Sequence, residues 1–423
     1  MAGQKSRRSL TPNRTAHGKA AKQRQLLIRA LRKSNRRRDP ERLALKYEAM
    51  RSSLFAFARG EPQLFYAQVD MPRALGIAPK VWLCGDLHVE NFGVFHGADG
   101  RAYFDLNDFD FAALAPCAVD LVRLFGTLEL AFDELDVPER ARRRHLEACL
   151  AAYRSELARG KPSWFEKKAA RGIIRKLVTR LSAQAPSNLL AKRTLLRAGV
   201  RRLKLGEGHA LAMTSRERRR AEKIFKRASR QTPALRELVL RDAARRVSGL
   251  ASLGLERYVL LASTPKAAGR YETLIDIKEA RPAAVPGASS TTRWRSDAER
   301  VVSVQQIVDA AAPAGLSAVM LGRKSFVVRE LQPREARVKL KALRPDDLGA
   351  LIADVGTLTA WAHLRGTSHW HATSVRSLTS FARRKGWAKA LRTAALAAAS
   401  RMRELHRLFR SIDPAALLDA PQH

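Results

Sequence analysis

Apolar positions gather in two dense regions of the chain, separated by a charged stretch with a poor apolar pattern, residues 161–235. In the first region, the apolar run of "KVWLCGD" (residues 80–86) predicts a buried strand. Two further apolar runs flank the turn Ala98-Asp99-Gly100, a pattern typical of a β-hairpin. Apolar side chains then recur on one helical face between Asp136, a predicted cap, and the closing Gly160.

The second dense region begins near residue 240 and carries more strand pattern than the first. The predicted strands lie at residues 257–264, 271–280 and 324–333. Apolar residues at helical spacing predict one helix that begins after a capping Ser296 and another that ends at Gly366. A basic helix over about residues 378–410 completes the chain. This mixture of helices and strands predicts an α+β fold.

Charge adds a prediction about partners. The 423 residues include 79 Lys and Arg against 40 Asp and Glu, a formal net charge of +39. This excess favours nucleic acid, anionic lipid or phosphorylated small molecules. The basic composition of residues 1–38 predicts that they form a disordered arm, which would bind nucleic acid or another polyanion nonspecifically. The apolar runs are short, so we expect no membrane-spanning helix. No secretory signal is seen and the three cysteines lack metal-type spacing, so we expect a cytoplasmic location.

The candidate chemistry lies directly after the first predicted strand, in "CGDLHVENFG" (residues 84–93). Here Asn91 follows Asp86 by five residues. In phosphoryl transfer an Asp can orient a hydroxyl and accept its proton, while an Asn one turn later can hold Mg²⁺. A second metal-binding carboxylate could come from "FDLNDFDFA", which contains Asp105, Asp108 and Asp110. The alternative interpretation is an acidic turn with side-chain caps and no cation.

The succession of "GDLHVENFG" and "FDLNDFD" resembles the bacterial family called domain of unknown function 2252. That family is similar to the protein-kinase-like fold, nearest to aminoglycoside and choline-type phosphotransferases. The resemblance implies a catalytic Asp86 and two Mg²⁺ ligands, Asn91 and Asp108, with Asp105 and Asp110 as rivals for the second. It also implies ATP as the nucleotide and an acceptor that the sequence does not identify.

The same resemblance assigns the nucleotide-binding half of a kinase to the second dense region. "SGLASLGLERYVLL" resembles a glycine-rich loop that covers phosphates, with Gly249 and Gly254 flanking Ser252. "IDIKEA" resembles the strand whose lysine holds the α- and β-phosphates, here Lys278. The helix that follows offers Glu299 as a partner for this lysine.

Two further assignments, and the order of the motifs, complete this interpretation. The backbone of Glu330–Gln332 resembles the segment that meets adenine, and Asp120 resembles the buried aspartate that steadies the catalytic loop. The catalytic loop and metal motif come first, at 85–110, while the glycine loop and lysine come later, at 249–278. This order is the reverse of an ordinary kinase. We therefore expect a protein-kinase-like, two-lobed, circularly permuted fold with extra helices.

The expected units are a basic disordered arm (1–38), the catalytic-loop and metal-site part of the large lobe (39–160), a helical connector (161–235), the small lobe (236–335) and the C-terminal helices of the large lobe (336–423). The function expected from them is ATP- and Mg-dependent phosphoryl transfer, or the related nucleotidyl transfer. Two alternatives remain open: a nucleotide-binding pseudokinase that regulates a partner, and a basic nucleic-acid-associated protein.

Overall fold

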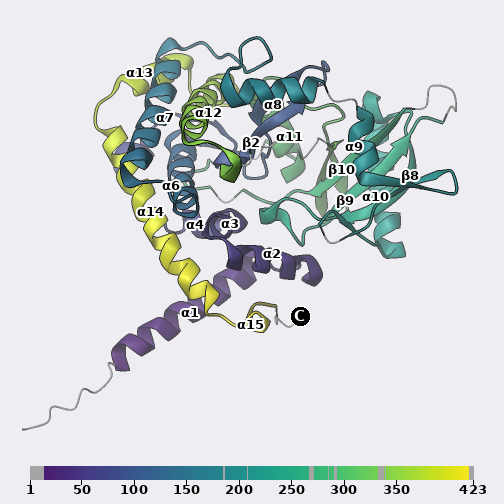
Figure 1. The fold of residues 1–423 in the computed structure, drawn as a ribbon, viewed down its shortest axis with the longest axis horizontal. Helices are drawn as coiled ribbons and strands as arrows, with labels where there is room; N and C mark the ends of the chain where they lie inside the picture. Colours follow the sequence, from purple (N-terminus) through teal and green to yellow (C-terminus); the bar gives the residue numbers. More distant parts are fainter. Residues whose placement is uncertain are drawn as a thin grey trace, which may run out of the picture.

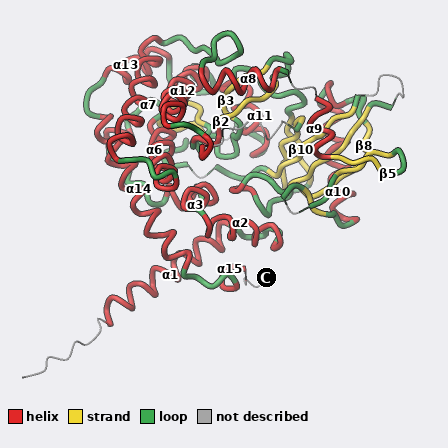
Figure 2. The backbone as a smooth tube through the Cα atoms, viewed as in Figure 1, coloured by secondary structure: helices red, strands yellow, loops and turns green. Residues whose placement is uncertain are grey.

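The computed structural model describes residues 14–183, 186–206, 208–265, 271–283, 285–289, 293–331, 338 and 340–418. Helices and strands are mixed, so the α+β class is confirmed. Figure 1 shows a helix-rich body and, beside it, a part built around a twisted sheet. Figure 2 shows that most of the strands lie in that second part. We call these two parts the helical body and the sheet part.

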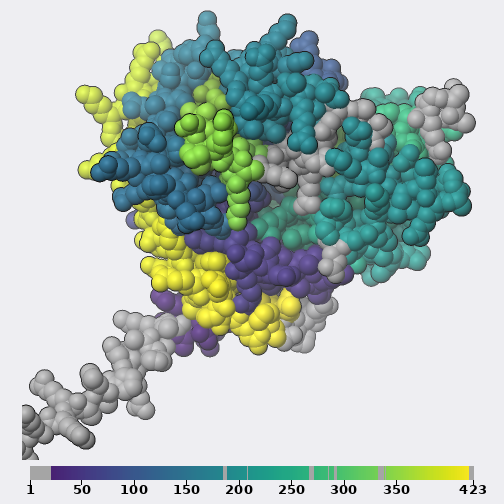
Figure 3. Space-filling view, viewed as in Figure 1, coloured from purple at the N-terminus to yellow at the C-terminus, as the bar shows by residue number. Residues whose placement is uncertain are grey.

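The helical body is made of segments from both ends of the chain. Its N-terminal helices are α1 (Arg14–Ser34), α2 (Pro40–Ser52), α3 (Leu54–Gly60), α4 (Pro62–Tyr66), α5 (Arg73–Gly76), α6 (Ala118–Glu134), α7 (Glu139–Arg159) and α8 (Gly172–Ser182). Its C-terminal helices are α12 (Pro345–Arg365), α13 (Val375–Arg383), α14 (Trp387–Arg410) and α15 (Ala415–Leu418). Figure 3 shows the N-terminal and C-terminal helices packed against each other, purple beside yellow, and α14 and α15 contact α1 and α2.

Short strand pairs also form, and the two between residues 80 and 116 frame the segment that carries the candidate chemistry. Antiparallel pairs join β1 (Lys80–Leu83) to β4 (Ala113–Pro116), β2 (Phe92–His96) to β3 (Ala102–Leu106), and β5 (Thr194–Arg197) to β6 (Val200–Leu203). The first strand and the hairpin expected from the sequence are therefore confirmed. The predicted hairpin turn at Gly100 is also present, with Gly100 in the left-handed region at φ 75°.

The sheet part has six antiparallel strands in the order β11-β12-β10-β9-β8-β7. They are β7 (Ala210–Leu211), β8 (Val239–Arg246), β9 (Arg257–Ser263), β10 (Glu272–Glu279), β11 (Ser317–Leu321) and β12 (Lys324–Glu330). Helix α10 (Ser215–Gln231) packs on the face that carries Ile275 and Ile277. Because side chains alternate along a strand, Asp276 and Lys278 lie on the opposite face. Helix α11 (Asp297–Val308) contacts β11 and β12.

Several local predictions differ from the structure. Helix α7 begins after Pro138 rather than at a cap on Asp136, which adopts φ 49° at the end of the preceding helix. The expected basic helix near the C-terminus is divided into α13 and α14 at Gly386, whose φ of 91° cannot continue a helix. The expected cap of α11 is confirmed, since the Ser296 hydroxyl accepts a hydrogen bond from Glu299 N at 3.1 Å.

The charged stretch 161–235 also contains β-strands that its sequence pattern did not predict. The β5–β6 hairpin and α9 (Pro186–Arg193) lie within it, and β7 joins the edge of the six-stranded sheet. Arginines occupy positions that would otherwise show apolar alternation, for example Arg201 and Arg202 in β6. The segment from β7 onward therefore belongs to the sheet part rather than to a connector.

The expectation of a disordered arm over residues 1–38 is wrong for the described residues from 14 on. Residues 14–34 form α1, whose Leu27 and Leu31 are buried in the main core. Below them, Lys46 Nζ donates to Glu61 at 2.8 Å and to Asn35 at 2.7 Å, and all three side chains are buried. Binding of polyanions by this segment stays a prediction. Among the described residues, no helix combines the length and apolar character needed to cross a bilayer.

Candidate active site

The loop after β1 is fixed at its first residue, Gly85. Gly85 N donates to the Asp120 carboxylate at 3.1 Å, and its carbonyl accepts from the Tyr66 hydroxyl at 2.8 Å. Gly85 adopts φ 77°, and a Cβ here would lie 2.0 Å from the Phe111 carbonyl oxygen. Only glycine fits this close approach of two backbones. The expected role of Asp120, steadying the loop by hydrogen bonding, is confirmed.

Asp86 is buried next to a buried arginine. Arg123, in α6, donates through Nε to the Asp86 carboxylate at 2.9 Å and through NH2 to the Ala58 carbonyl at 2.8 Å. The guanidinium also stacks over the Phe65 ring, 4.5 Å from its centroid. Burial raises the pKa of Asp86, and the charge of Arg123 offsets part of that rise. Arg123 thus fixes the orientation of the Asp86 carboxylate.

Asn91 joins the catalytic loop to the acidic loop after the hairpin. Its side-chain amide donates to the Asp86 carbonyl at 3.2 Å and to the Asp108 carbonyl at 3.1 Å. Its Oδ1 atom is buried and accepts no hydrogen bond from any described residue. A buried amide oxygen without a donor is an available ligand for a hard cation.

Lys278 brings the sheet part to this acidic loop. Its Nζ atom donates to both Asp108 carboxylate oxygens at 3.1 Å and lies 2.5 Å from an Asp110 oxygen. The lysine side chain is 8% exposed, whereas the Asp108 side chain is 42% exposed, so Asp108 remains open to a ligand. The structure therefore places Lys278, Asp108 and Asp110 together from two distant segments of the chain.

The two carboxyl groups have opposite pKa shifts. Removal from water raises the pKa of Asp108, but Lys278 and Arg329 outweigh this and hold that pKa below its ordinary range. Burial and the neighbouring Asp108 charge raise the pKa of Asp110 to about 6, despite the charge of Lys278. Asp108 is thus the member of the pair that stays ionised over the wider pH range.

Asp105 does not reach this cluster. Its carboxylate accepts from Arg365 NH2 at 2.7 Å, from Ala310 N at 3.0 Å and from Leu106 N at 2.9 Å. It therefore ties β3 to the end of α12 and to the residues after α11. Of the three aspartates considered for the metal, Asp105 serves this structural network instead.

The donors near Asp108 are few. Among the described residues, no group of three or more His, Cys, Asp or Glu side chains could hold a metal ion. Mg²⁺ nevertheless fits a smaller protein set, because it commonly uses one or two carboxylates and completes its octahedron with phosphate oxygens and water. Asn91 Oδ1 and Asp108, with Asp110 beside them, match that requirement.

An arginine that was not predicted from the sequence holds the glycine-containing loop between β8 and β9 through hydrogen bonds. Arg257 NH1 donates to the Ser248 carbonyl at 2.9 Å and to the Ser252 hydroxyl at 3.3 Å. Its Nε and NH2 atoms donate to Asp276 at 3.1 and 2.7 Å. A Cβ on Gly249 would lie 2.8 Å from the guanidinium, so glycine lets the loop settle on Arg257.

Asp276 also binds Arg246, at 2.5 Å, and thereby gathers two arginines on the Lys278 face of the sheet. The arginine charges hold the pKa of this buried carboxyl below its ordinary range, against the effect of burial. The only sequence signal was the polar spacing in "IDIK", where Asp276 and Lys278 share a face. The charges of Asp108 and Asp110 act on Arg257 too, which shows that this face looks toward the acidic loop.

Two residues assigned to nucleotide binding have other contacts. A Cβ on Gly254 would approach Arg38 at 2.7 Å, and the Gly254 carbonyl accepts from Asp39 N at 2.7 Å, so this glycine packs on the α1–α2 link. Glu299 does not pair with Lys278, because its carboxylate caps the start of α11 by accepting from Arg295 N at 2.8 Å. The expected Lys278–Glu299 pair is therefore wrong, whereas nucleotide binding at Gly254 stays a prediction.

Arg300, one position after Glu299, is the α11 residue that reaches the acidic loop. Its guanidinium donates to the Ala112 carbonyl and, at 3.1 Å, to the Asp110 carbonyl. Successive helical residues differ by about 100° in direction, which explains why the neighbour of the predicted residue makes the contact.

The segment expected to meet adenine is only partly described. Glu330 N donates to the Ala314 carbonyl at 3.1 Å and Leu331 N to the Leu274 carbonyl at 2.7 Å. The Glu330 carboxylate accepts from Thr273 at 2.5 Å and from Tyr271 at 2.9 Å. These two N–H groups are therefore committed within the protein, Gln332 lies outside the described residues, and the adenine contact of this segment stays a prediction.

A cavity of about 690 Å³ adjoins the catalytic loop. Gly249 and Leu250 line it from the sheet part, and Phe55, Arg59 and Glu90 line it from the helical body. Arg59 forms an ion pair with Glu90, which belongs to the same short loop as Asp86 and Asn91. The cavity is thus a candidate space for a substrate that reaches Asp86.

Comparison with known proteins adds one relationship. No curated protein and no solved structure matches the chain. Residues 37–412 match the family described as uncharacterized protein conserved in bacteria (DUF2252), and this span contains Asp86, Asn91, the acidic loop and Lys278. The match covers well over half of the sequence, and the chain therefore belongs to the DUF2252 family.

Proposed function

We propose that this protein is an ATP- and Mg-dependent phosphotransferase with a circularly permuted, protein-kinase-like fold. The observation that carries the proposal is the convergence of Lys278, Asp108 and Asn91. Lys278 Nζ lies 3.1 Å from Asp108, and Asn91 binds the Asp108 carbonyl while its own Oδ1 stays unpaired. A basic group for phosphates and oxygen ligands for a divalent cation are the minimal parts of such a site.

The order of elements in the sheet part supports the kinase-like interpretation. The glycine-containing loop joins β8 to β9, the next strand β10 carries Lys278, and α11 then leads to β11 and β12. This is the succession that the resemblance assigns to a small lobe: phosphate loop, lysine strand, helix and hinge strand. Contacts between α11 and the acidic loop through Arg300 agree with it.

Contacts after α12 support the permutation. In the resemblance this helix precedes the catalytic loop, which here lies near the N-terminus. The chain after α12 does lie against β1, since Thr373 N donates to the Lys80 carbonyl at 2.8 Å and Trp82 Nε1 to the His369 carbonyl at 2.9 Å. Arg365, the last residue of α12, binds Asp105 beside the acidic loop. The end of α12 and the start of the catalytic segment are thus neighbours in space.

The residues suggest a simple division of labour. Lys278 binds phosphate oxygens, while Asn91 Oδ1 and Asp108 hold Mg²⁺. Bound Mg²⁺ neutralises charge on the phosphate oxygens. Asp86, oriented by Arg123, accepts the acceptor hydroxyl's proton as the new oxygen–phosphorus bond forms and the bond to the departing ADP breaks. The cavity lined by Arg59 and Glu90 would hold the acceptor beside the loop that carries Asp86.

Product analysis tests this proposal. Protein, ATP and Mg²⁺ are incubated with a small-molecule extract, and mass spectrometry records compounds that gain phosphate or AMP. We expect phosphate gain with the wild type and its loss with Asp86→Asn, which should still bind ATP. Asp70→Asn is the matched control because Asp70 is exposed and away from the site. Equal transfer by Asp86→Asn would refute the assignment, and ATP binding without any product would favour a pseudokinase.

A further inference from the structure

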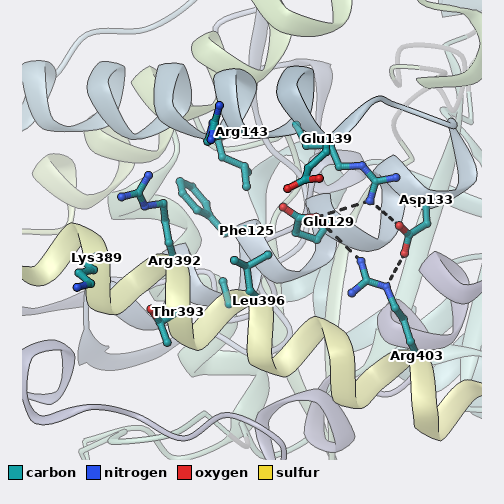
Figure 4. A pocket seen from close by; sticks show the side chains of 13 residues that line it. Phe125, Glu129, Asp133, Glu139, Arg143, Lys389, Arg392, Thr393, Leu396 and Arg403 are labelled. Atoms are coloured by element: carbon teal, nitrogen blue, oxygen red, sulfur yellow. Dashed lines mark hydrogen bonds and ion pairs between the residues drawn. The ribbon is translucent and has the colours of Figure 1, made fainter.

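A second cavity of about 690 Å³ lies between α6, α7 and α14, on a different face of α6 from the catalytic contacts. Arg123 of α6 holds Asp86, whereas Phe125, two residues later, lines this cavity. Two helical residues separated by two positions point about 200° apart. Glu129 and Asp133 follow Phe125 at intervals of four and share its face, so one stripe of α6 forms a wall of the cavity (Figure 4).

The floor of this cavity is apolar. Phe125 and Leu146 are buried residues whose side chains reach the cavity from α6 and α7, and Leu396 of α14 lines it while 48% exposed. Leu396 is the exposed apolar side chain of this floor and lies over the buried Phe125 and Leu146, so an apolar group that packs on it would lose contact with water. The cavity volume falls within the ordinary range of about 300–1,000 Å³ for small-molecule sites.

At one end of the cavity, two acidic and two basic side chains form ion pairs with one another. Arg142 and Arg403 bind the two oxygens of Asp133 at 2.6 and 2.7 Å, and both approach Glu129 at 3.8 and 4.0 Å. Figure 4 shows Glu129, Asp133 and Arg403 joined in this network. Their charges largely satisfy one another, so this end forms a fixed wall rather than a free binding group.

The other end carries three basic side chains, of which one is paired. The exposed side chains of Arg143 and Lys389 contact no acidic group among the described residues, whereas Arg392 makes an ion pair with Glu147 at 3.1 Å. In the view of Figure 4, Arg143 and Arg392 lie on either side of the Phe125 ring. Five cationic side chains line the cavity against three carboxylates, and the surplus lies at this end. Glu139 is the one lining carboxylate outside the matched network.

We propose that this cavity binds a small organic anion with a flat apolar body. The apolar body would pack on Phe125 and Leu396, and the anionic group would meet Arg143 and Arg392. The strongly basic chain favours anions over cations in any case, and the apolar floor distinguishes this site from a simple phosphate site. The assignment does not depend on the function proposed for Asp86 and Lys278.

Calorimetry with two probes of the same body and opposite charge tests the proposal on the full chain. The probes are 2-naphthoate and 2-naphthylmethylammonium. We expect naphthoate to bind at least about tenfold more tightly than the ammonium, as one charge-assisted contact implies. Absence of naphthoate binding, or equal binding of the two probes, would overturn the proposal.

Matched variants place the probe in this cavity. Arg143→Glu should weaken naphthoate binding about tenfold, and Leu396→Asp should abolish it. Arg144→Glu is the control, because Arg144 is an exposed neighbour with the same charge that does not line the cavity. Thermal unfolding of each variant checks that it is folded. Equal affinities for Arg143→Glu and Arg144→Glu would show that the anion binds elsewhere and would refute the site.

Discussion

Lys278 and Asp108 are 170 positions apart in the chain, yet Lys278 Nζ lies 3.1 Å from both carboxylate oxygens of Asp108. The two residues lie on separate elements. Lys278 lies on β10 of the six-stranded sheet, and Asp108 lies on the loop after the β2–β3 hairpin. Asn91 fastens that loop to the one that holds Asp86. One site thus depends on the packing of the sheet part against the helical body.

Replacement of Gly85 should disturb the catalytic loop more than replacement of another left-handed glycine. Gly85→Ala places a Cβ 2.0 Å from the Phe111 carbonyl, whereas Gly100→Ala, at a similar φ, meets no atom within 4 Å. We expect about 1 kcal/mol of destabilisation for Gly100→Ala and about 3 kcal/mol or more for Gly85→Ala, measured by urea unfolding. Equal losses would mean that the loop has room to move away from Phe111.

The bridging amide of Asn91 should matter for both stability and metal affinity. Asn91→Leu leaves the Asp86 and Asp108 carbonyls without their donor, at a cost of about 1–3 kcal/mol in unfolding free energy. It should also raise the Mg²⁺ concentration needed for ATP binding. Asn107→Leu is the control, because within the described part of the chain only backbone atoms of Asn107 make hydrogen bonds. An unchanged Mg²⁺ requirement in Asn91→Leu would remove Asn91 from the metal site.

Asp110 predicts a pH dependence with a definite sign. Its pKa is raised from 3.8 to about 6 in the folded protein, so the folded state holds a proton that the unfolded state releases between these values. Its contribution to stability is therefore present below pH 4 and is lost as pH rises through 6, by at most about 3 kcal/mol. The unfolding free energy of the wild type minus that of Asp110→Asn should therefore decrease as pH rises from 4 to 6. An increase over this range would contradict the raised pKa of Asp110.

The buried pair of Lys46 and Glu61 should anchor α1 to the body. Glu61→Gln leaves the Lys46 charge buried without its partner, so it should lower the unfolding free energy by about 3–5 kcal/mol. The double variant Lys46→Met/Glu61→Gln should recover much of that loss, since no charge then stays buried alone. Additive losses in this double-mutant cycle, followed by chemical denaturation, would show that the two charges act independently.

Residues whose neighbours lie close in sequence were predictable. Asp86 and Asn91 follow a strongly apolar run, so local pattern marked them together with the three aspartates of the next hairpin. The family resemblance, not the pattern, singled out Asp108 and Lys278. The choice between Asp105 and Asp108 was not decidable in this way. It depends on Arg365, which arrives from α12 and binds Asp105.

Pairings across strands and helices escaped prediction for a physical reason. Arg257 lies opposite Lys278 only in the observed register of β9 and β10, and its partner Asp276 requires the same register. Glu299 was expected to face Lys278, but the sequence does not fix the rotation of α11 about its axis, and Arg300 contacts the acidic loop instead. The burial of Leu27 and Leu31 was hidden by the basic composition around them.

The most direct measurement is calorimetric titration of ATP, with and without Mg²⁺, into wild type, Lys278→Met and Asp108→Asn. Asp70→Asn is the charge-matched control, and thermal unfolding checks that each protein is folded. The account predicts Mg²⁺-dependent binding to the wild type and the control, and binding at least about tenfold weaker in both site variants. Failure of the wild type to bind ATP, or wild-type affinity in Lys278→Met and Asp108→Asn, would contradict it.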